Sequence, residues 1–348
     1  MLTRPPSLIW LRQIPKVELH LHLEGSIQPS LLRQLAAKNS VPLPPLGSAG
    51  ETREPAYRYD NFIQFLDCFK TACSTIHSPE DLAIAADVLF DTLIHENVRY
   101  TEIFISPVIH ERKGISTYES MKLIHAVAEQ KRRNHGFRCQ FLFDAVRQWG
   151  VESCALNARL AEACSKWGIV GIGIGGDESS LPAQAFSQVF QRARAAGLRL
   201  TAHAGEHAGP ESVREALRHL HPERIGHGIR AADDPQLLDV LLKSGITLDI
   251  SLTSNLRTSV CLKYEDHPIK KIHAAHVPFT LNTDDPALFD TTISQELLLG
   301  STLLGLECEA VAELMIRALH SSFLPGSEKD RMADSFRSDF RKLSLDKI

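Results

Sequence analysis

Short runs of apolar and β-branched residues alternate along the chain with longer amphipathic segments. Eight such runs occur, and most are continuous, as is typical of parallel strands that are covered on both faces. The first run differs, because apolar and polar residues alternate from Val17 to Leu23. The predicted strands are Lys16–Leu23, Arg99–Ser106, Arg138–Val146, Ile169–Gly176, Leu198–Gly205, Arg224–Ile229, Ile246–Thr253 and Val277–Asp285.

The amphipathic segments between these runs predict helices. Asp233-Asp234-Pro235 is a helix-start signal, and Gly197 and Gly245 stand where two helices should end. Alternation of strand and helix over eight strands predicts an α/β fold, a (β/α)8 TIM barrel. The predicted helices between strands are Thr117–Asn134, Glu152–Lys166, Pro182–Ala196, Glu211–His219 and Asp233–Lys243.

The spacing of the strands is regular except for a gap of about 75 residues after the first one. We expect a single domain over residues 1–348, with a helical insertion at about 29–97 and C-terminal helices at about 291–348. An apolar stripe at i, i+3, i+4 and i+7 begins at Phe62 and indicates a helix packed on the core. The alternative is that the helix over 59–75 is a lid, because insertions after a barrel strand lie on the catalytic side.

Composition excludes several classes of protein. The chain of 348 residues is 43% hydrophobic and 23% charged, which is ordinary for a folded soluble protein. Its formal charge of −4 does not indicate the net positive charge that is typical of nucleic-acid-binding proteins. The seven cysteines include no C-x-x-C pair, and no apolar run is long enough to span a membrane or serve as a signal peptide. We therefore expect a cytoplasmic protein with no membrane or nucleic-acid partner, whose oligomeric state the sequence does not specify.

Sixteen histidines justify a search for a metal or proton-transfer site. His20 and His22 are two apart on a predicted strand, so both imidazoles can approach one metal ion. His203, His227 and the pair Asp284-Asp285 stand at the ends of the fifth, sixth and eighth strands. Each residue alone could be a core histidine or a capping aspartate. Their joint placement where barrel enzymes carry their active sites predicts a catalytic centre.

The sequence around these residues resembles the adenosine deaminase family of zinc aminohydrolases, which share a metal-dependent hydrolase barrel. The resemblance follows the family's order over nearly the whole chain. Its motifs are PKVELHLHLEGSI (Pro15–Ile27), GGDE (Gly175–Glu178), TAHAGE (Thr201–Glu206), RIGHG (Arg224–Gly228), TSN (Thr253–Asn255) and TLNTDDPALF (Thr280–Phe289).

The resemblance implies one zinc ion per chain and hydrolytic deamination at C6 of an adenine ring, with release of ammonia. The implied metal ligands are His20, His22, His203 and Asp284.

The resemblance also implies roles in proton transfer and substrate binding. Glu206 would donate a proton to purine N1, and His227 would help to deprotonate the attacking water. Asp285 would orient that water and contact the purine, and the backbone at Gly176 would meet the base edge. We expect burial or neighbouring carboxylates to raise the pKa of Glu206, because a proton donor must be held neutral.

Two positions depart from the adenosine-specific pattern. Glu24 stands where adenosine deaminases usually have Asp at the ribose end of the substrate, and its extra methylene adds about 1.5 Å of reach. Enzymes that resemble adenine deaminase or aminodeoxyfutalosine deaminase also tend to carry Glu there. Phe104 replaces an Arg of many relatives, which would remove a structural salt bridge.

The substrate therefore stays open at this stage. Adenosine and 6-amino-6-deoxyfutalosine are the leading candidates, and free adenine or an N6-substituted adenine nucleotide is the alternative within the enzyme class. The alternative from another class is a zinc-binding barrel without turnover.

Other motifs give weaker signals. Gly171–Gly176 satisfies G-x-G-x-x-G, but no acidic residue follows between Ser179 and Ala204, as a dinucleotide site requires. His22-Leu23-Glu24 mimics the H-x-E of cytidine deaminases, which also need P-C-x-x-C. Related metal-dependent barrel hydrolases often hold two metal ions bridged by a modified lysine near the fourth strand. No lysine ends that strand here, which favours one metal ion over two. We expect surface or packing roles for His207 and His219.

Overall fold

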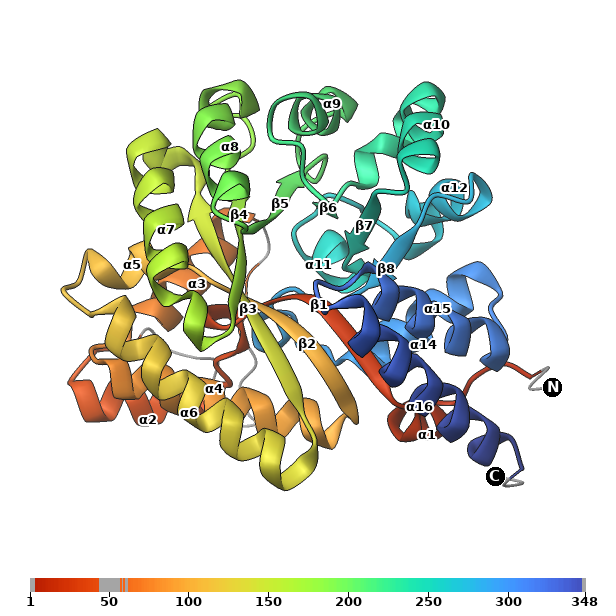
Figure 1. Cartoon of the computed structure of the whole chain (residues 1–348), viewed down its shortest axis with the longest axis horizontal. Helices are drawn as coiled ribbons and strands as arrows, with labels where there is room; N and C mark the ends of the chain where they lie inside the picture. The colour runs from red at the N-terminus through yellow and green to blue at the C-terminus, as the bar shows by residue number, and fades with distance from the viewer. Residues whose placement is uncertain (1–3, 44–56, 58, 60–61, 346–348) are drawn as a thin grey trace.

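The structure is a computed structural model that describes residues 4–43, 57, 59 and 62–345. Eight parallel strands, hydrogen-bonded in the order β1 to β8, form the wall of a barrel with helices around it (Figure 1). The predicted (β/α)8 fold is confirmed. The strands are β1 (Lys16–His22), β2 (Val98–Ile105), β3 (Arg138–Val146), β4 (Ile169–Gly175), β5 (Arg199–Ala204), β6 (Arg224–His227), β7 (Thr247–Ile250) and β8 (Phe279–Leu281).

Backbone contacts close the barrel between its first strand and the segment that follows its last. Leu21 and Asp284 form a parallel bridge. The N–H of His22 donates to the carbonyl oxygen of Asp284 (2.7 Å), and the N–H of Asp284 donates to that of His20 (3.1 Å). The seam of the barrel therefore holds three of the four predicted metal ligands in register.

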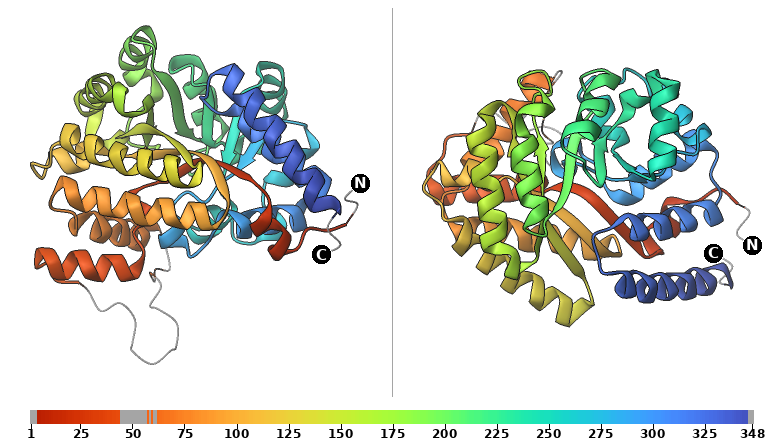
Figure 2. Two further views of the ribbon diagram at one scale, coloured as in Figure 1. Left: turned by 60° about the horizontal axis from the view of Figure 1, so that its bottom comes forward. Right: turned by 45° about the horizontal axis from the view of Figure 1, so that its top comes forward.

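Helices cover the outside of the barrel and extend it at both ends of the chain (Figure 2). Three of them, α2 to α4, lie between β1 and β2, and α14 to α16 follow β8. No helix in the described ranges is long and apolar enough to cross a membrane. The helices are α1 (Leu8–Gln13), α2 (Pro29–Asn39), α3 (Phe62–Ser74), α4 (Pro79–His95), α5 (Pro107–Glu111), α6 (Thr117–His135), α7 (Gly150–Cys164), α8 (Ser187–Ala195), α9 (Pro210–His219), α10 (Pro235–Ser244), α11 (Leu252–Arg257), α12 (Ile269–Ala274), α13 (Pro286–Phe289), α14 (Ile293–Leu304), α15 (Cys308–Ser321) and α16 (Gly326–Leu345).

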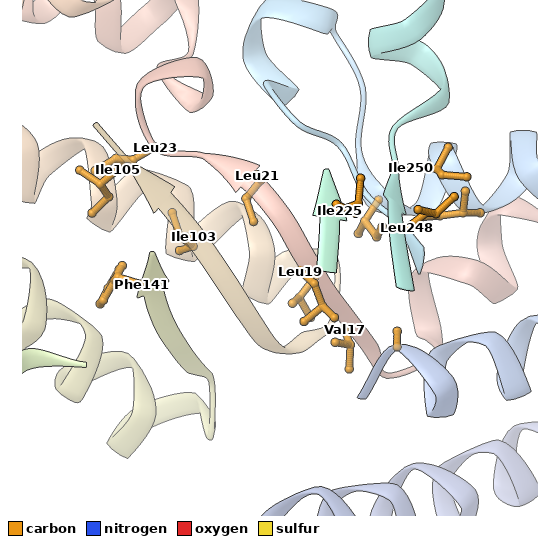
Figure 3. Packing of buried hydrophobic residues seen from close by; sticks show 14 of the residues in the cluster. Val17, Leu19, Leu21, Leu23, Ile103, Ile105, Phe141, Ile225, Leu248 and Ile250 are labelled. Atoms are coloured by element: carbon orange, nitrogen blue, oxygen red, sulfur yellow. The ribbon is translucent and has the colours of Figure 1, made fainter. Parts of the chain in front are cut away.

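The alternating pattern of the first strand has a direct structural reason. Val17, Leu19 and Leu21 belong to the apolar cluster formed with residues of neighbouring strands (Figure 3). The intervening side chains point into the barrel: Glu18 accepts a hydrogen bond from the N–H of Thr283 after β8 (2.8 Å). All seven residues of β1 are buried, so both faces are covered although their chemistry differs.

A buried ionic network fills part of the barrel interior. The guanidinium of Arg224 on β6 forms ion pairs with Glu102 on β2 (2.7 Å) and with Asp249 on β7 (2.8 Å), and all three side chains are 1% exposed or less. Asp249 also accepts a hydrogen bond from Thr280 on β8 (2.8 Å). Two carboxylates on one cation compensate the desolvation that would make a lone buried arginine very unfavourable.

Some predicted boundaries were wrong near the catalytic end of the barrel. The seventh strand stops at Ile250, because the chain turns there into α11, and β8 spans only Phe279–Leu281. Asp284, predicted within that strand, has φ +65°, a left-handed conformation that ends regular strand pairing. The helix predicted from Pro182 begins as a 3-10 turn before α8, since no side chain caps its start.

Candidate metal centre and active site

Four side chains converge at the C-terminal ends of the strands. His20 and His22 lie on β1, His203 lies on β5 and Asp284 follows β8. One possible ligand atom from each lies within 4.8 Å of the others. Nε2 of His20 and Nε2 of His22 lie 3.4 and 3.3 Å from the same Asp284 oxygen. The fold therefore brings together the four ligands named from the sequence.

The chemistry of this cluster fits a divalent metal ion. Neither ring nitrogen of the buried His20 has a hydrogen-bond partner among the described residues, which leaves Nε2 available as a ligand. Burial lowers the pKa of both His20 and His203 and so favours the neutral imidazole that binds metals. Burial also opposes a charge on His22, yet Asp284 and its neighbour raise the pKa of His22 to about 10. The carboxylates thus attract a positive charge to this point.

Neighbouring groups orient two of the ligands. The backbone carbonyl of Ile174 lies 3.2 Å from Nδ1 of His203, so a proton on Nδ1 leaves Nε2 free for a metal. The hydroxyl of Ser254 at the start of α11 donates to Asp284 Oδ2 (2.7 Å). Ser254 belongs to the TSN motif, and this contact gives the motif a structural role beside the metal cluster.

Phe104 packs directly against the histidines. Its ring lies 4.7 Å from the ring of His20 and stacks on that of His22 at 5.2 Å. Phe104 therefore forms an apolar wall behind two of the candidate metal ligands.

Glu206 and His227 lie next to the metal cluster. Oε2 of Glu206, which follows β5, is 3.6 Å from Nε2 of His227 at the end of β6, and the same Nε2 is 3.8 Å from Asp284 Oδ2. His207 is not only a surface residue, because its Nε2 lies 3.3 Å from Glu206 Oε1. The predicted rise in the pKa of Glu206 is wrong for this structure. Burial raises that pKa, but the nearby His227 and His207 together outweigh burial and lower it.

The backbone is strained at two of these residues. His227 has φ +59° and Asp284 has φ +65°, conformations that cost a residue other than glycine about 1–3 kcal/mol each. Asp285 also depends on an unusually close approach, since a Cβ on Gly25 would lie 1.6 Å from its Oδ1. Burial and the carboxylate of Asp284 raise the pKa of Asp285 well above its usual range.

Glu178 is a functional candidate that the sequence reasoning missed, although it stands in the GGDE motif. Its carboxylate is buried and accepts hydrogen bonds from the N–H groups of Gly205 (2.7 Å), Glu206 (2.8 Å) and His207 (2.8 Å). It also accepts one from the hydroxyl of Ser212 on α9. One side chain therefore fixes the backbone that carries Glu206.

A cavity of about 230 Å³ opens onto the metal cluster. Helix α3 contributes apolar and aromatic side chains to its wall, including Phe65, Leu66 and Phe69. Gly176 at the end of β4 is part of the lining and has φ +92°, a conformation that favours glycine.

Glu24 lies away from the cavity wall. Its Oε1 accepts a hydrogen bond from the N–H of Ser106 (2.9 Å) and lies 3.0 Å from Nε2 of His110, and Glu24 is fully buried. Asp144 at the end of β3, which the sequence reasoning did not single out, does line the cavity. The signal that could have identified it is a lone carboxylate within the apolar run FLFDAV.

Together the fold and the cluster define a TIM-barrel enzyme whose candidate metal centre lies at the C-terminal ends of its strands, as in metal-dependent hydrolases. Residues 15–338 match the pattern of the family described as adenosine deaminase. The chain belongs to the adenosine deaminase family.

Individual relatives agree with this assignment. An aminodeoxyfutalosine deaminase from Streptomyces coelicolor is 35% identical, covering 92% of this chain and 83% of that protein. An adenine deaminase from Chelativorans sp. is 32% identical, covering 91% and 96%. The crystal structure of an adenine deaminase from Arthrobacter aurescens superimposes with a TM-score of 0.86 at 27% identity, covering 93% and 98%. The resemblance seen in the motifs and the prediction of a deaminase are confirmed.

Proposed function

We propose that this protein catalyses zinc-dependent hydrolytic deamination at C6 of the adenine ring of a purine nucleoside, giving the 6-oxo product and ammonia. The observation that carries the proposal is the convergence of His20, His22, His203 and Asp284 beside Glu206 and His227, all of which except His20 line one cavity. We expect one zinc ion per chain. All seven cysteines are free thiols, which supports a reducing cytoplasm as the site of action.

The donor set of three imidazoles and one carboxylate is one that zinc accepts readily. When bound there, zinc would supply the Lewis acidity that lowers the pKa of water toward neutrality. The carbon that bears an aromatic amino group is a poor electrophile, and ammonia is a poor leaving group. The side chains around the metal must therefore move one proton to the ring nitrogen next to that carbon and another, taken from the attacking water, to the departing amino group.

Three residues of this chain would serve these steps, two by transferring protons and one by orienting the water. Glu206 would protonate N1 of the ring, His227 would accept a proton from the attacking water, and Asp285 would orient that water and contact the purine. The N–H of Gly176 would meet the base edge. Since His227 and His207 lower the pKa of Glu206 in the free site, its neutral, proton-donating form would have to be stabilised by a hydrogen bond to the bound ring.

The choice among adenine derivatives rests on two observations. The aminodeoxyfutalosine deaminase of Streptomyces coelicolor is 35% identical to this chain, which favours 6-amino-6-deoxyfutalosine over adenosine. Glu24, predicted to meet the substrate, is instead held by Ser106 and His110, so we assign it the indirect role of fixing that part of the wall. Adenine is the second candidate, because adenine deaminases reach 32% identity.

The test is kcat/KM for the zinc-loaded protein on 6-amino-6-deoxyfutalosine, adenosine, 2′-deoxyadenosine, adenine and N6-methyl-AMP. We expect one of them to lead by orders of magnitude, because a site that leaves buried polar groups unpaired rejects a substrate strongly. Full zinc occupancy with no deamination of any of the five would contradict the proposal and favour a binding protein without turnover.

Glu206→Gln tests the assigned proton donor. The variant should keep its zinc and lose about 10²- to 10⁴-fold in kcat, the usual contribution of a positioned acid. Glu211→Gln is the matched control, because Glu211 is an exposed carboxylate five positions along the chain. Near-normal turnover of Glu206→Gln would remove Glu206 from this role.

A further inference from the structure

Asp144, at the end of β3, is a buried carboxylate to which the proposed chemistry gives no role. Its side chain is 7% exposed and lines the cavity that opens onto the metal cluster. Oδ1 has no hydrogen-bond partner among the described residues. A buried acceptor without a partner is unfavourable, so such groups in native structures usually await a ligand, a water or an ion.

Two candidate partners within the protein, His203 and Arg147, make no hydrogen bond to Asp144, although Nε of Arg147 is itself without a partner among the described residues. Nδ1 of His203 is 4.0 Å from Asp144 Oδ1, beyond hydrogen-bonding distance, and it pairs instead with the carbonyl of Ile174 at 3.2 Å. The guanidinium of Arg147 donates to the carbonyls of Leu181 (3.2 Å) and His203 (3.1 Å). Asp144 therefore does not orient a metal ligand by a hydrogen bond of its own.

The neighbouring strand makes room for this carboxylate. A Cβ on Gly173 would lie 2.5 Å from Asp144 Oδ1, and a Cβ on Gly175 would lie 2.6 Å from Oδ2. Any larger residue at either position would therefore push the carboxylate aside. The glycines that mimic a dinucleotide motif thus keep Asp144 at the cavity wall.

The position of Asp144 selects the part of the ligand that it can reach. Glu206, His227 and Asp285 lie at the ends of β5, β6 and β8, so the C6–N1 edge of an adenine ring must face that side. Strand β4, with Gly176, lies between β5 and β3. A ring that extends across the end of β4 brings its N3–N9 edge toward Asp144. On that edge, free adenine carries the N9–H donor and a nucleoside carries the ribose 2′-hydroxyl.

We propose that Asp144 is a substrate-binding residue that accepts a hydrogen bond from a donor at or next to N9 of the adenine ring. The inference rests on the proposed function and adds the contact that recognises the side of the ring remote from the chemistry. The donor is N–H for a base and O–H for a nucleoside, and both present the same chemistry to a carboxylate.

The test combines a substitution in the protein with removal of the donor from the substrate, as in a double-mutant cycle. Wild type, Asp144→Ala and the isosteric Asp144→Asn are compared on two pairs of substrates: adenosine with 2′-deoxyadenosine, and adenine with 9-methyladenine. In the wild type, loss of the donor should lower kcat/KM roughly 10- to 100-fold in at least one pair, the range for a hydrogen bond to a charged group. In Asp144→Ala the ratio of kcat/KM between the two substrates of that pair should lie within about threefold of one. The pair that responds identifies whether the donor is the base N–H or the sugar hydroxyl.

One variant serves as the control, and different results would contradict the inference and the proposed function. Asp177→Asn removes an exposed carboxylate, bonded to Ser179, from the end of β4, and it should leave every ratio unchanged. If the wild type is active and both ratios are the same in Asp144→Ala, the inference is wrong while the proposed function stands. Loss of zinc from Asp144→Asn would also overturn it, because Asp144 would then belong to the metal site. A zinc-loaded wild type that is inactive on these four substrates and also on 6-amino-6-deoxyfutalosine and N6-methyl-AMP refutes the proposed function itself.

Discussion

Glu178→Gln is the perturbation that best separates positioning from chemistry in this site. Glu178 does not line the cavity, and its carboxylate satisfies the backbone N–H groups of the loop that carries Glu206. Gln has almost the same shape, so the substitution removes the charge and one acceptor oxygen while the packing stays nearly unchanged.

The magnitude follows from the donors that each oxygen serves. Oε2 accepts from the N–H of Gly205 and the hydroxyl of Ser212, and Oε1 accepts from the N–H groups of Glu206 and His207. An amide group turned toward Ser212 can donate to its hydroxyl but leaves the N–H of Gly205 unpaired. The opposite orientation leaves the N–H groups of both Glu206 and His207 unpaired. One orphaned N–H plus weaker bonds to a neutral oxygen amounts to about 3 kcal/mol of stability.

The assay pairs urea unfolding with steady-state kinetics at saturating zinc. We expect the free energy of unfolding to fall by about that amount and kcat to fall about 10²-fold, the cost of misplacing a reacting group by about 1 Å. KM should change little, because the cavity wall is intact. Asp177→Asn, which makes the same charge change one residue away at an exposed site, is the control. Wild-type kcat in a Glu178→Gln protein that has lost the expected stability would refute the positioning argument.

Three further changes test other parts of the site. Gly25→Ala should retain zinc but lose more than about 10-fold in kcat, since its Cβ would lie 1.6 Å from Oδ1 of Asp285 and must displace that carboxylate; normal kcat would contradict the contact. Asp284→Ala should lose zinc, measured by metal analysis after dialysis, because it removes one of four ligands; full zinc content would refute the assignment. Burial raises the pKa of Glu296 to about 7 from an unfolded value near 4.5, so the native state prefers its protonated form. Its stabilising contribution is complete below about pH 4.5 and is lost as the pH rises to 7, and Glu296→Gln should flatten that part of the curve of unfolding free energy against pH.

The sequence allowed the barrel and the convergence of polar residues at its rim to be predicted because both depend on simple geometry, whereas the set of four metal ligands was implied by the family resemblance. Parallel strands in one barrel end at the same rim, so polar residues at several strand ends must meet there. Residues two apart on β1 share a face, which brings His20 and His22 to one point. Such arguments need only strand order and the alternation of side chains.

The features that the sequence did not reveal depend on contacts between distant segments. The motif that contains Glu24 gave no sign that its carboxylate lies against His110, 86 positions away. The position of the Glu178 carboxylate depends on backbone N–H groups 27 and 28 positions further along the chain. The lowered pKa of Glu206 reflects two histidines whose distances only the folded chain defines.

The glycines of β4 show how one motif can serve several unrelated contacts. A Cβ on Gly171 would lie 2.2 Å from the carbonyl oxygen of Arg199, so this glycine protects the pairing of β4 with β5. Gly173 and Gly175 face the interior of the barrel and leave space for Asp144 and, in the case of Gly175, for His203 as well. The run therefore reflects the contacts of β4 with both neighbouring strands, and it leaves room for the unpartnered carboxylate that we propose contacts the N9 side of the adenine ring.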